Sequence, residues 1–478
     1  MTQPKKAYPI AILPGDYPDP SVVRVGDDYY MTHSSFDYMP GLLVWHSRNL
    51  TEWEPIGHAV HTDVGCIMAP DMIWHEGRFY IYFPAAQSNW VVTAESPEGP
   101  WSEPVNLHVG YIDPGHAVDE AGNRYLFLSE GYRIRLAEDG LSTTGELRKV
   151  YEGWRYPAEW RTEGFYLESP KLTYRNGYYY MTCAQGGTAG PATSHMIISA
   201  RAKSIDGPWE NSPYNPIVRT ESRAERWWSK GHGTLVDTPE GDWYVVYHAY
   251  EKNYATLGRQ TLLEPIRWED DGWFRTADQP ELPQLPPAGS IALSDDFESE
   301  RLSPQWHFYD RSGLTGYGVG DGRLMLQGQS KEAIEPLLCI PYHHTYEASV
   351  TVQAEEGTEG HLSLFYKPGF QCGIGFNGTH VFSFRDQYRS EYTEAAADAV
   401  TLRIVNDCHD VDLYYRIGGS DWRKLDHGFE MSGFHNNVLG KFLSLRIALD
   451  AVGDGKASFS RFIYNGIAGS GQTEEGEV

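Results

Sequence analysis

Three acidic residues stand in settings that suit a carboxyl group for chemistry. Asp19 is flanked by proline on both sides, Asp113 precedes a proline, and Glu168 stands alone among apolar and small residues. Proline fixes the backbone and removes a competing amide donor, which holds a neighbouring carboxyl in place. A partly desolvated carboxyl has a raised pKa, which would suit Glu168 for donating a proton. An Asp beside Pro is also common in ordinary turns, so each motif alone is weak.

The reaction that such acids could perform is the cleavage of a glycosidic bond. That reaction needs two carboxyl groups on opposite sides of the bond, one to protonate the leaving oxygen and one to activate water or attack carbon. Each of the three acids precedes a copy of a repeated strand pattern, and each stands at a similar position relative to the copy that follows it. This coincidence carries more weight than any single motif.

The repeat that must position the acids is a turn with Gly or Asp, then an aromatic pair and a short apolar strand. Its five copies recur roughly every 45 to 65 residues, which is the range of propeller blades. They begin at Gly26, Gly77, Gly122, Asn176 and Gly241. Helical periodicity is nearly absent, which favours an all-β architecture. We therefore predict a five-bladed β-propeller, in which the ends of the inner strands converge on one pocket. An irregular β-sandwich is the alternative.

The second half of the chain shows a different pattern. Residues 278–290 are rich in proline and lack alternation, as in a stiff linker. Beyond them, apolar and polar residues alternate, for example over 346–352 and 400–405, which predicts a β-sandwich. We expect a catalytic propeller over 1–285, the end of the linker over 286–291, a sandwich over 292–467 and a polar, acidic, disordered tail over 468–478.

Composition excludes several classes of partner. With 39 basic and 65 acidic residues the formal net charge is −26, so a nucleic acid would be repelled. Five widely spaced cysteines without a Cys-x-x-Cys motif predict free thiols in a reducing compartment. No signal peptide is visible, and no run approaches the roughly 18 apolar residues that span a membrane. We expect a cytoplasmic protein without a membrane partner; the oligomeric state stays open.

Three motifs in combination resemble glycoside hydrolase family 43, the β-xylosidase and α-L-arabinofuranosidase family. They are Tyr-Pro-Asp-Pro-Ser at 17–21, Ile-Asp-Pro at 112–114 and Glu-Ser-Pro-Lys-Leu at 168–172, and the resemblance covers nearly the whole chain. It implies an inverting, exo-acting glycosidase that releases a terminal β-D-xylose or α-L-arabinofuranose from short plant-polysaccharide oligosaccharides. Galactose-type substrates and a non-catalytic sugar-binding propeller are the alternatives. A retaining fructan-type hydrolase would need an Asn-Asp-Pro and a Glu-Cys segment, which do not stand at these positions.

The same resemblance implies roles for the three acids. Asp19 matches the general base, Glu168 matches the general acid, and Asp113 matches a third carboxylate that orients the acid and tunes its pKa. Where many β-xylosidases of the family have Trp-Ala-Pro-His, this chain has Met-Ala-Pro-Asp at 68–71. This departure puts the identity of the sugar in doubt and makes Asp71 a rival for the role of third carboxylate.

Four further residues match segments of the family that contact sugar or line the channel. Phe36 matches an aromatic wall of the sugar pocket, Thr188 lies in a matching segment, and Arg259 matches the residue that holds sugar hydroxyls with its rigid donor fork. His232 matches a histidine at the bottom of the channel, near a calcium ion in some members; a hydrogen-bonded core histidine is the alternative. No cofactor is expected to be required, and a structural calcium is the one candidate metal. The C-terminal half resembles the concanavalin-like jelly roll of the family's β-xylosidases.

Overall fold

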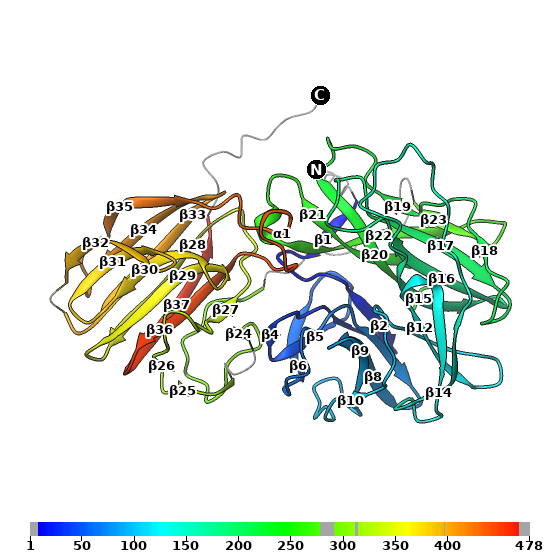
Figure 1. Cartoon of the computed structure of the whole chain (residues 1–478), viewed down its shortest axis with the longest axis horizontal. Helices are drawn as coiled ribbons and strands as arrows, with labels where there is room; N and C mark the ends of the chain where they lie inside the picture. The colour runs from blue at the N-terminus through cyan, green and yellow to red at the C-terminus, as the bar shows by residue number, and fades with distance from the viewer. Residues whose placement is uncertain (1–7, 278–290, 311–313, 396, 468–478) are drawn as a thin grey trace. The chain divides into compact units, whose positions relative to one another are not determined.

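The computed structural model describes residues 8–277, 291–310, 314–395 and 397–467. Strands dominate these ranges, and α1 (Asn436–Leu439) is the only α-helix within them (Figure 1). No helix in the described ranges has the length and apolar character needed to cross a membrane. The prediction of an all-β chain is confirmed.

The chain divides into two compact units. One comprises Met1–Asn253 and Arg259–Ile291, and the other comprises Tyr254–Gly258 and Ala292–Val478. A short segment near the end of the first sequence region therefore belongs to the second unit. The predicted linker at 286–291 lies outside the described residues except for Ile291, and the predicted tail at 468–478 lies wholly outside them.

The first unit is a five-bladed propeller in which each blade is one antiparallel sheet. The innermost strand of each blade precedes the second and third strands of that blade in the sequence. These strands are β2 (Ser21–Val25), β7 (Asp71–His75), β11 (Gly115–Val118), β15 (Glu168–Arg175) and β20 (Trp227–Asp237). β2 packs against β7 and β20, β7 packs against β11, and β15 packs against β11 and β20, so the inner strands form a closed ring. This ring places the starts of all five strands around one axis.

The five sequence repeats form the second strand of each blade. These strands are β3 (Asp28–Thr32), β8 (Arg78–Ala85), β12 (Arg124–Leu128), β16 (Tyr178–Gln185) and β21 (Trp243–Glu251). A tight hairpin turn joins each to its inner strand. Between β15 and β16, for example, Asn176 and Gly177 have φ values of 51° and 79°, and this pair of positive φ values is what an Asn-Gly turn supplies.

The remaining strands complete the blades and close the ring. The third strands are β5 (Gly41–Ser47), β9 (Ser88–Ala94), β13 (Tyr132–Leu136), β17 (Met196–Ala202) and β22 (Arg259–Trp268). The outer strands of four blades are β6 (Glu54–Val60), β10 (Val105–Asn106), β14 (Thr143–Lys149) and β18 (Glu210–Asn211). In the last blade the outer strand is β1 (Ile10–Leu13), which pairs with β22. The first and last parts of the propeller sequence thus meet in one sheet.

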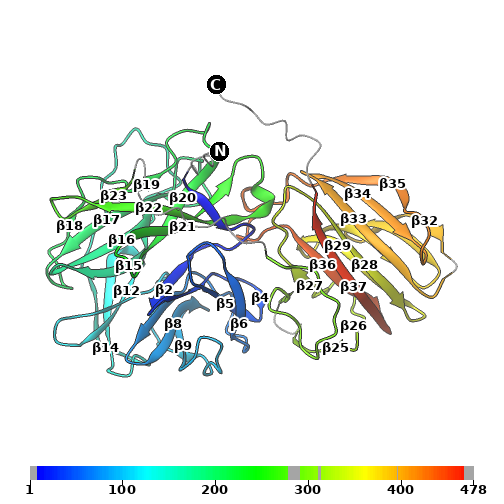
Figure 2. The same cartoon turned by 180° about the vertical axis from the view of Figure 1, so that it is seen from behind.

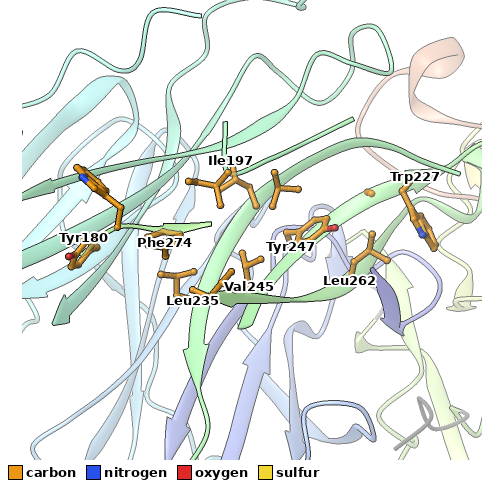
Figure 3. Packing of buried hydrophobic residues seen from close by; sticks show 13 residues of the cluster. Tyr180, Ile197, Trp227, Leu235, Val245, Tyr247, Leu262 and Phe274 are labelled. Carbon is orange, nitrogen blue, oxygen red and sulfur yellow. The ribbon is translucent and has the colours of Figure 1, made fainter. Parts of the chain in front are cut away.

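The blades are held together by apolar layers between neighbouring sheets. Figure 3 shows such a layer, in which Tyr180 and Ile197 of the fourth blade lie against Leu235, Val245 and Leu262 of the fifth. All are buried, so the layer removes a large apolar area from water. Residues of each strand pack into such layers. The repeats are therefore rich in aromatic and apolar residues.

The second unit is a sandwich of two antiparallel sheets, visible as the yellow-to-red strands in Figure 2. One sheet has the order β32 (Tyr388–Glu394), β31 (His380–Arg385), β30 (Phe370–Phe376), β29 (Thr358–Lys367), β36 (Arg446–Gly453), β27 (Leu337–Cys339) and β24 (His307–Tyr309). The other has the order β25 (Tyr317–Gly320), β26 (Arg323–Gln327), β37 (Lys456–Gly466), β28 (Thr345–Ala354), β33 (Val400–Asp407), β34 (Asp410–Arg416) and β35 (Arg423–Glu430). Along β28, Ala348, Val350 and Val352 are buried at every second position, as the alternation predicts.

Candidate active site

The three predicted acids stand at equivalent places on the propeller. Asp19 and Asp113 each lie two residues before an inner strand, β2 and β11, and Glu168 is the first residue of inner strand β15. Because equivalent ends of the inner strands surround one axis, the three side chains come together. The charges of Asp19 and Glu168 both raise the pKa of Asp113. Separate motifs in the sequence therefore form one cluster.

Asp19 is a buried carboxylate with a fixed orientation. The Arg259 guanidinium donates from Nη1 to Oδ1 at 2.9 Å and from Nη2 to Oδ2 at 3.4 Å, and the Ser34 hydroxyl donates to Oδ2 at 2.5 Å. Burial would raise the pKa of Asp19, but the charge of Arg259 outweighs it and holds this pKa well below 3.8. Asp19 is therefore ionised, as a group that accepts a proton from water must be.

His248, on β21, also positions Asp19, although the sequence analysis did not single it out. The backbone N–H of Asp19 donates to His248 Nδ1 at 3.0 Å, so Nδ1 must be the unprotonated nitrogen of a neutral ring. The other nitrogen, Nε2, lies 3.4 Å from Thr188 Oγ1. Burial, followed by the charge of Arg259, lowers the pKa of His248 to about 3, in agreement with a neutral ring. The one signal in the sequence is a histidine within a strand that is otherwise apolar.

The other predicted pocket residues surround Asp19. Arg259 holds the carboxylate directly, and its Cζ lies 5.6 Å from the centre of the Phe36 ring. Thr188 is connected to Asp19 through His248, because His248 contacts Thr188 with one ring nitrogen and the backbone of Asp19 with the other. The three residues predicted to contact sugar are thus gathered around one carboxylate.

The donor set around His232 does not fit a calcium ion. Ligand atoms of Asp19, His232 and His248 lie within 4.8 Å of one another. Ca²⁺ takes about six to eight oxygen ligands, whereas this set offers one carboxylate and two imidazole nitrogens. Arg259 already donates to the same Asp19 oxygen that faces both histidines. Burial lowers the pKa of His232 to about 3, so the ring is neutral, and its Nε2 has no hydrogen-bond partner within the described ranges.

Asp113 and Glu168 form a coupled pair of carboxyl groups. Burial raises the pKa of Glu168 to about 7, assisted by the charges of Asp19 and Glu163 and opposed by Arg259. Burial also raises the pKa of Asp113, assisted by Glu168 and Asp19. Two interacting carboxyl groups lose their protons stepwise, and because both pKa values are raised, the last proton leaves the pair only near or above neutral pH. Glu163, an exposed residue, is a contributor that the sequence analysis did not identify.

The backbone is strained at the places where these groups enter the site. Asp19, Asp113 and His232 have φ values of 59°, 56° and 61°, in the left-handed region. Such a conformation costs about 1–3 kcal/mol for a residue other than glycine and persists only where the surroundings over-determine it. Strain at three residues of one cluster is typical of a functional site.

A bulge aims Glu168 into the cluster. In the pairing of β15 with β16, Glu168 faces Ala184 and Lys171 faces Thr182, so β15 contains one extra residue. Residues three apart in a regular strand point to opposite faces, but this bulge turns Glu168 and Lys171 to the same face. The sequence analysis placed Glu168 before a strand but did not foresee the bulge.

Gly115 allows the Asp113 segment to approach the Glu168 segment. A Cβ atom added at Gly115 would lie 1.5 Å from the carbonyl oxygen of Pro170, so only glycine fits. We expect Gly115→Ala to force the two segments apart and to lower kcat/KM by about 100-fold, since a 1 Å misplacement of catalytic groups can have that effect. Gly110→Ala is the matched control, because its Cβ would meet nothing closer than 3.8 Å. Steady-state kinetics of both variants check this, and equal activities would contradict it.

Asp71 is engaged in structural contacts. Its Oδ1 accepts from the Lys171 ammonium at 2.9 Å and its Oδ2 accepts from the backbone N–H of His116 at 2.7 Å. The Ser21 hydroxyl lies 3.4 Å from Oδ1. These partners occupy both oxygens, which favours Asp113 over Asp71 as the third carboxylate.

The raised pKa of Glu168 has a consequence for stability. The pKa in the folded state is about 7 and the ordinary value is 4.5, so the folded state binds the extra proton between these values and loses stability as the pH rises through them. We expect Glu168→Gln, which cannot ionise, to be more stable than wild type by about 3 kcal/mol at pH 8 and no more stable at pH 4. Thermal unfolding at both pH values measures this. A Glu168→Gln variant that is less stable at pH 8 would argue against a buried, proton-retaining Glu168.

Comparisons with known proteins agree with this arrangement. Residues 8–274 match the family model described as Glycosyl hydrolases family 43. The chain is similar to the non-reducing end alpha-L-arabinofuranosidase BoGH43B of Bacteroides ovatus, with 32% identity over 359 residues covering 68% of this chain and 65% of that protein. It is also similar to a xylan 1,3-beta-xylosidase of a Vibrio species, with 33% identity over 348 residues covering 61% of this chain and 63% of that protein. The match thus spans a little under two thirds of the length of these two relatives.

The fold has close counterparts among solved structures. The crystal structure of the GH43 protein BlXynB from Bacillus licheniformis superimposes with a TM-score of 0.85 and 28% identity, covering 96% of this chain and all of that one. The likeness therefore includes both the propeller and the sandwich, and the predicted fold class is confirmed. Because the family model matches more than half of the sequence, the chain belongs to glycosyl hydrolases family 43.

Proposed function

We propose that this protein is an inverting, exo-acting glycosidase that releases a terminal pentose, β-D-xylose or α-L-arabinofuranose, from short oligosaccharides. The observation that carries the proposal is the opposite displacement of two pKa values in one buried cluster. That of Asp19 is held well below 3.8, whereas that of Glu168 is raised to about 7. When the surroundings move the pKa values of two carboxyl groups in opposite directions, the group with the lowered pKa is suited to act as the base and the group with the raised pKa as the acid. The names of the relatives support a pentose as the sugar.

In the proposed mechanism the two carboxyl groups act on opposite faces of the sugar. The Asp19 carboxylate, oriented by Arg259 and Ser34, takes a proton from a water molecule that attacks the anomeric carbon. Glu168 gives its proton to the departing glycosidic oxygen. Asp113 holds the negative charge beside Glu168 and so keeps that proton available. Inversion needs room for the water, so we expect a separation of about 6.5–9.5 Å between the carboxyl groups of Asp19 and Glu168 in the complex with sugar.

The cysteines support the expectation of a reducing compartment. All five lie in the described ranges and none is in a disulfide. Burial raises the pKa of the thiols of Cys183, Cys339 and Cys372, which makes them unreactive. An enzyme in such a compartment would act on short imported oligosaccharides, in agreement with exo-action.

A panel of 4-nitrophenyl glycosides tests the function. The panel contains β-D-xylopyranoside, α-L-arabinofuranoside, β-D-galactopyranoside and β-D-glucopyranoside, and NMR of the fresh product identifies the anomer released. The proposal expects the fastest turnover on one of the two pentosides and an inverted anomer. Release of the retained anomer, or turnover confined to a hexoside, would contradict it.

A further inference from the structure

A buried lysine links the two segments that carry the coupled carboxyl groups. Lys171 lies on β15, three residues after Glu168, and only 4% of its surface is exposed. Its ammonium donates to Asp71 Oδ1 at 2.9 Å, to the Pro70 carbonyl at 2.7 Å and to the Pro114 carbonyl at 3.1 Å. These three acceptors satisfy all three donors of the ammonium. The mechanism described above does not use this lysine.

The contacts of Lys171 join parts of the propeller that carry the site. Pro114 follows Asp113 directly, so the lysine fastens the Asp113 segment to the strand that begins with Glu168. Its partner Asp71 is held in turn by the backbone N–H of His116 and by Ser21. The ammonium is thus fixed by blades two, three and four, and its position relative to the carboxyl pair is fixed with it.

The charge of Lys171 acts on one member of the pair. Burial and the charges of Glu168 and Asp19 raise the pKa of Asp113, and the charge of Lys171, followed by a backbone hydrogen bond from Ser169, opposes that rise. The charges that act on Glu168 are those of Asp19, Glu163 and Arg259. Asp71 on β7 forms an ion pair with the ammonium, and the charge of the ammonium also acts on the neutral His232 on β20.

We propose that Lys171 is a positioning residue that keeps the negative charge of the carboxyl pair on Asp113, so that the one proton of the pair stays on Glu168. The inference rests on the proposed glycosidase function and deepens it. Without the ammonium, the deeply buried Asp113 keeps the proton and Glu168 is ionised, which leaves no acid for the departing oxygen. The lysine acts through the two carboxyl groups and does not contact the sugar.

Lys171→Met removes the charge and keeps a side chain of similar length. The comparison uses the 4-nitrophenyl pentoside that wild type cleaves fastest and a disaccharide of the same sugar. We expect kcat/KM to fall by about 100-fold or more on the disaccharide and by less than about 10-fold on the nitrophenyl glycoside, which needs no proton to depart. We also expect the basic limb of the disaccharide pH profile to move up by about one pH unit, because loss of a cation favours the protonated pair. Lys203→Met, at an exposed lysine just after β17 of the same blade, is the control and should match wild type.

Asp71→Asn is a second variant with the opposite expected sign. It keeps the shape of the side chain but leaves the lysine charge without its counter-charge, so the basic limb should move down by about one pH unit. If Lys171→Met does not fold, the direction in which the basic limb moves in Asp71→Asn tests the proposed role of Lys171. Equal losses on the two substrates in Lys171→Met, or an unmoved or upward limb in Asp71→Asn, would overturn the proposal.

The failure of the proposed function is distinguishable from a failure of this inference. If wild type releases no pentose or keeps the anomeric configuration, the function itself is wrong whatever the variants do. If wild type behaves as proposed but the pH profiles of both variants coincide with its own, only the role of Lys171 is wrong.

Discussion

Asp19→Asn is expected to lower kcat by about 10⁴-fold on every substrate, whatever the leaving group. No leaving group, however good, replaces the water molecule that Asp19 activates, so disaccharides and nitrophenyl glycosides should lose activity equally. Asparagine keeps the size of the side chain and can still face Arg259, so binding should change far less than turnover. Steady-state kinetics on both substrate types at pH 6 measure the effect.

The residual activity of Asp19→Asn should also show a changed pH dependence. The charge of Asp19 raises the pKa of Glu168, so its removal should move the basic limb of the profile to lower pH. Asp27→Asn, in the exposed turn between β2 and β3, is the matched control and should behave as wild type. An Asp19→Asn variant with more than about one hundredth of wild-type activity would mean that another group activates the water.

Glu168→Ala should have a large effect that depends on the leaving group. We expect kcat/KM for a disaccharide to fall by about 10³- to 10⁴-fold, because the sugar alkoxide cannot depart without a proton. For a 4-nitrophenyl glycoside the fall should stay within about 10-fold, since nitrophenolate departs unprotonated. The basic limb near pH 7, where Glu168 loses its proton in wild type, should disappear from the profile of the variant. A series of aryl glycosides with leaving groups of increasing pKa measures the dependence.

A matched control for this variant comes from the loop before β15. Glu159→Ala removes an exposed carboxyl from the same loop and should leave both substrates unaffected. If Glu168→Ala lowers the two substrate types by the same factor, Glu168 is not the proton donor, even if the propeller and the position of Asp19 are as described.

The part of this protein that local physics specifies was predictable from the sequence. Each repeat combines a tight turn with an apolar strand, and both depend on residues that are neighbours in the chain. The five repeats therefore predicted the five blades. The alternation after residue 340 marked the sandwich for the same reason. The acids could be found because Asp19, Asp113 and Glu168 stand at one phase of the repeat.

What the tertiary structure decided is which groups act on these acids. Asp19 meets Arg259 across 240 positions of sequence, a contact that exists because β1 closes the ring by pairing with β22. The contact between Lys171 and Asp71, 100 positions apart, likewise needs three blades in place. His248 and the bulge in β15 gave no clear signal, since a histidine in a strand and a Ser-Pro pair have many other uses. A pKa depends on burial and on charges brought close by folding, and neither quantity can be read from spacing along the chain.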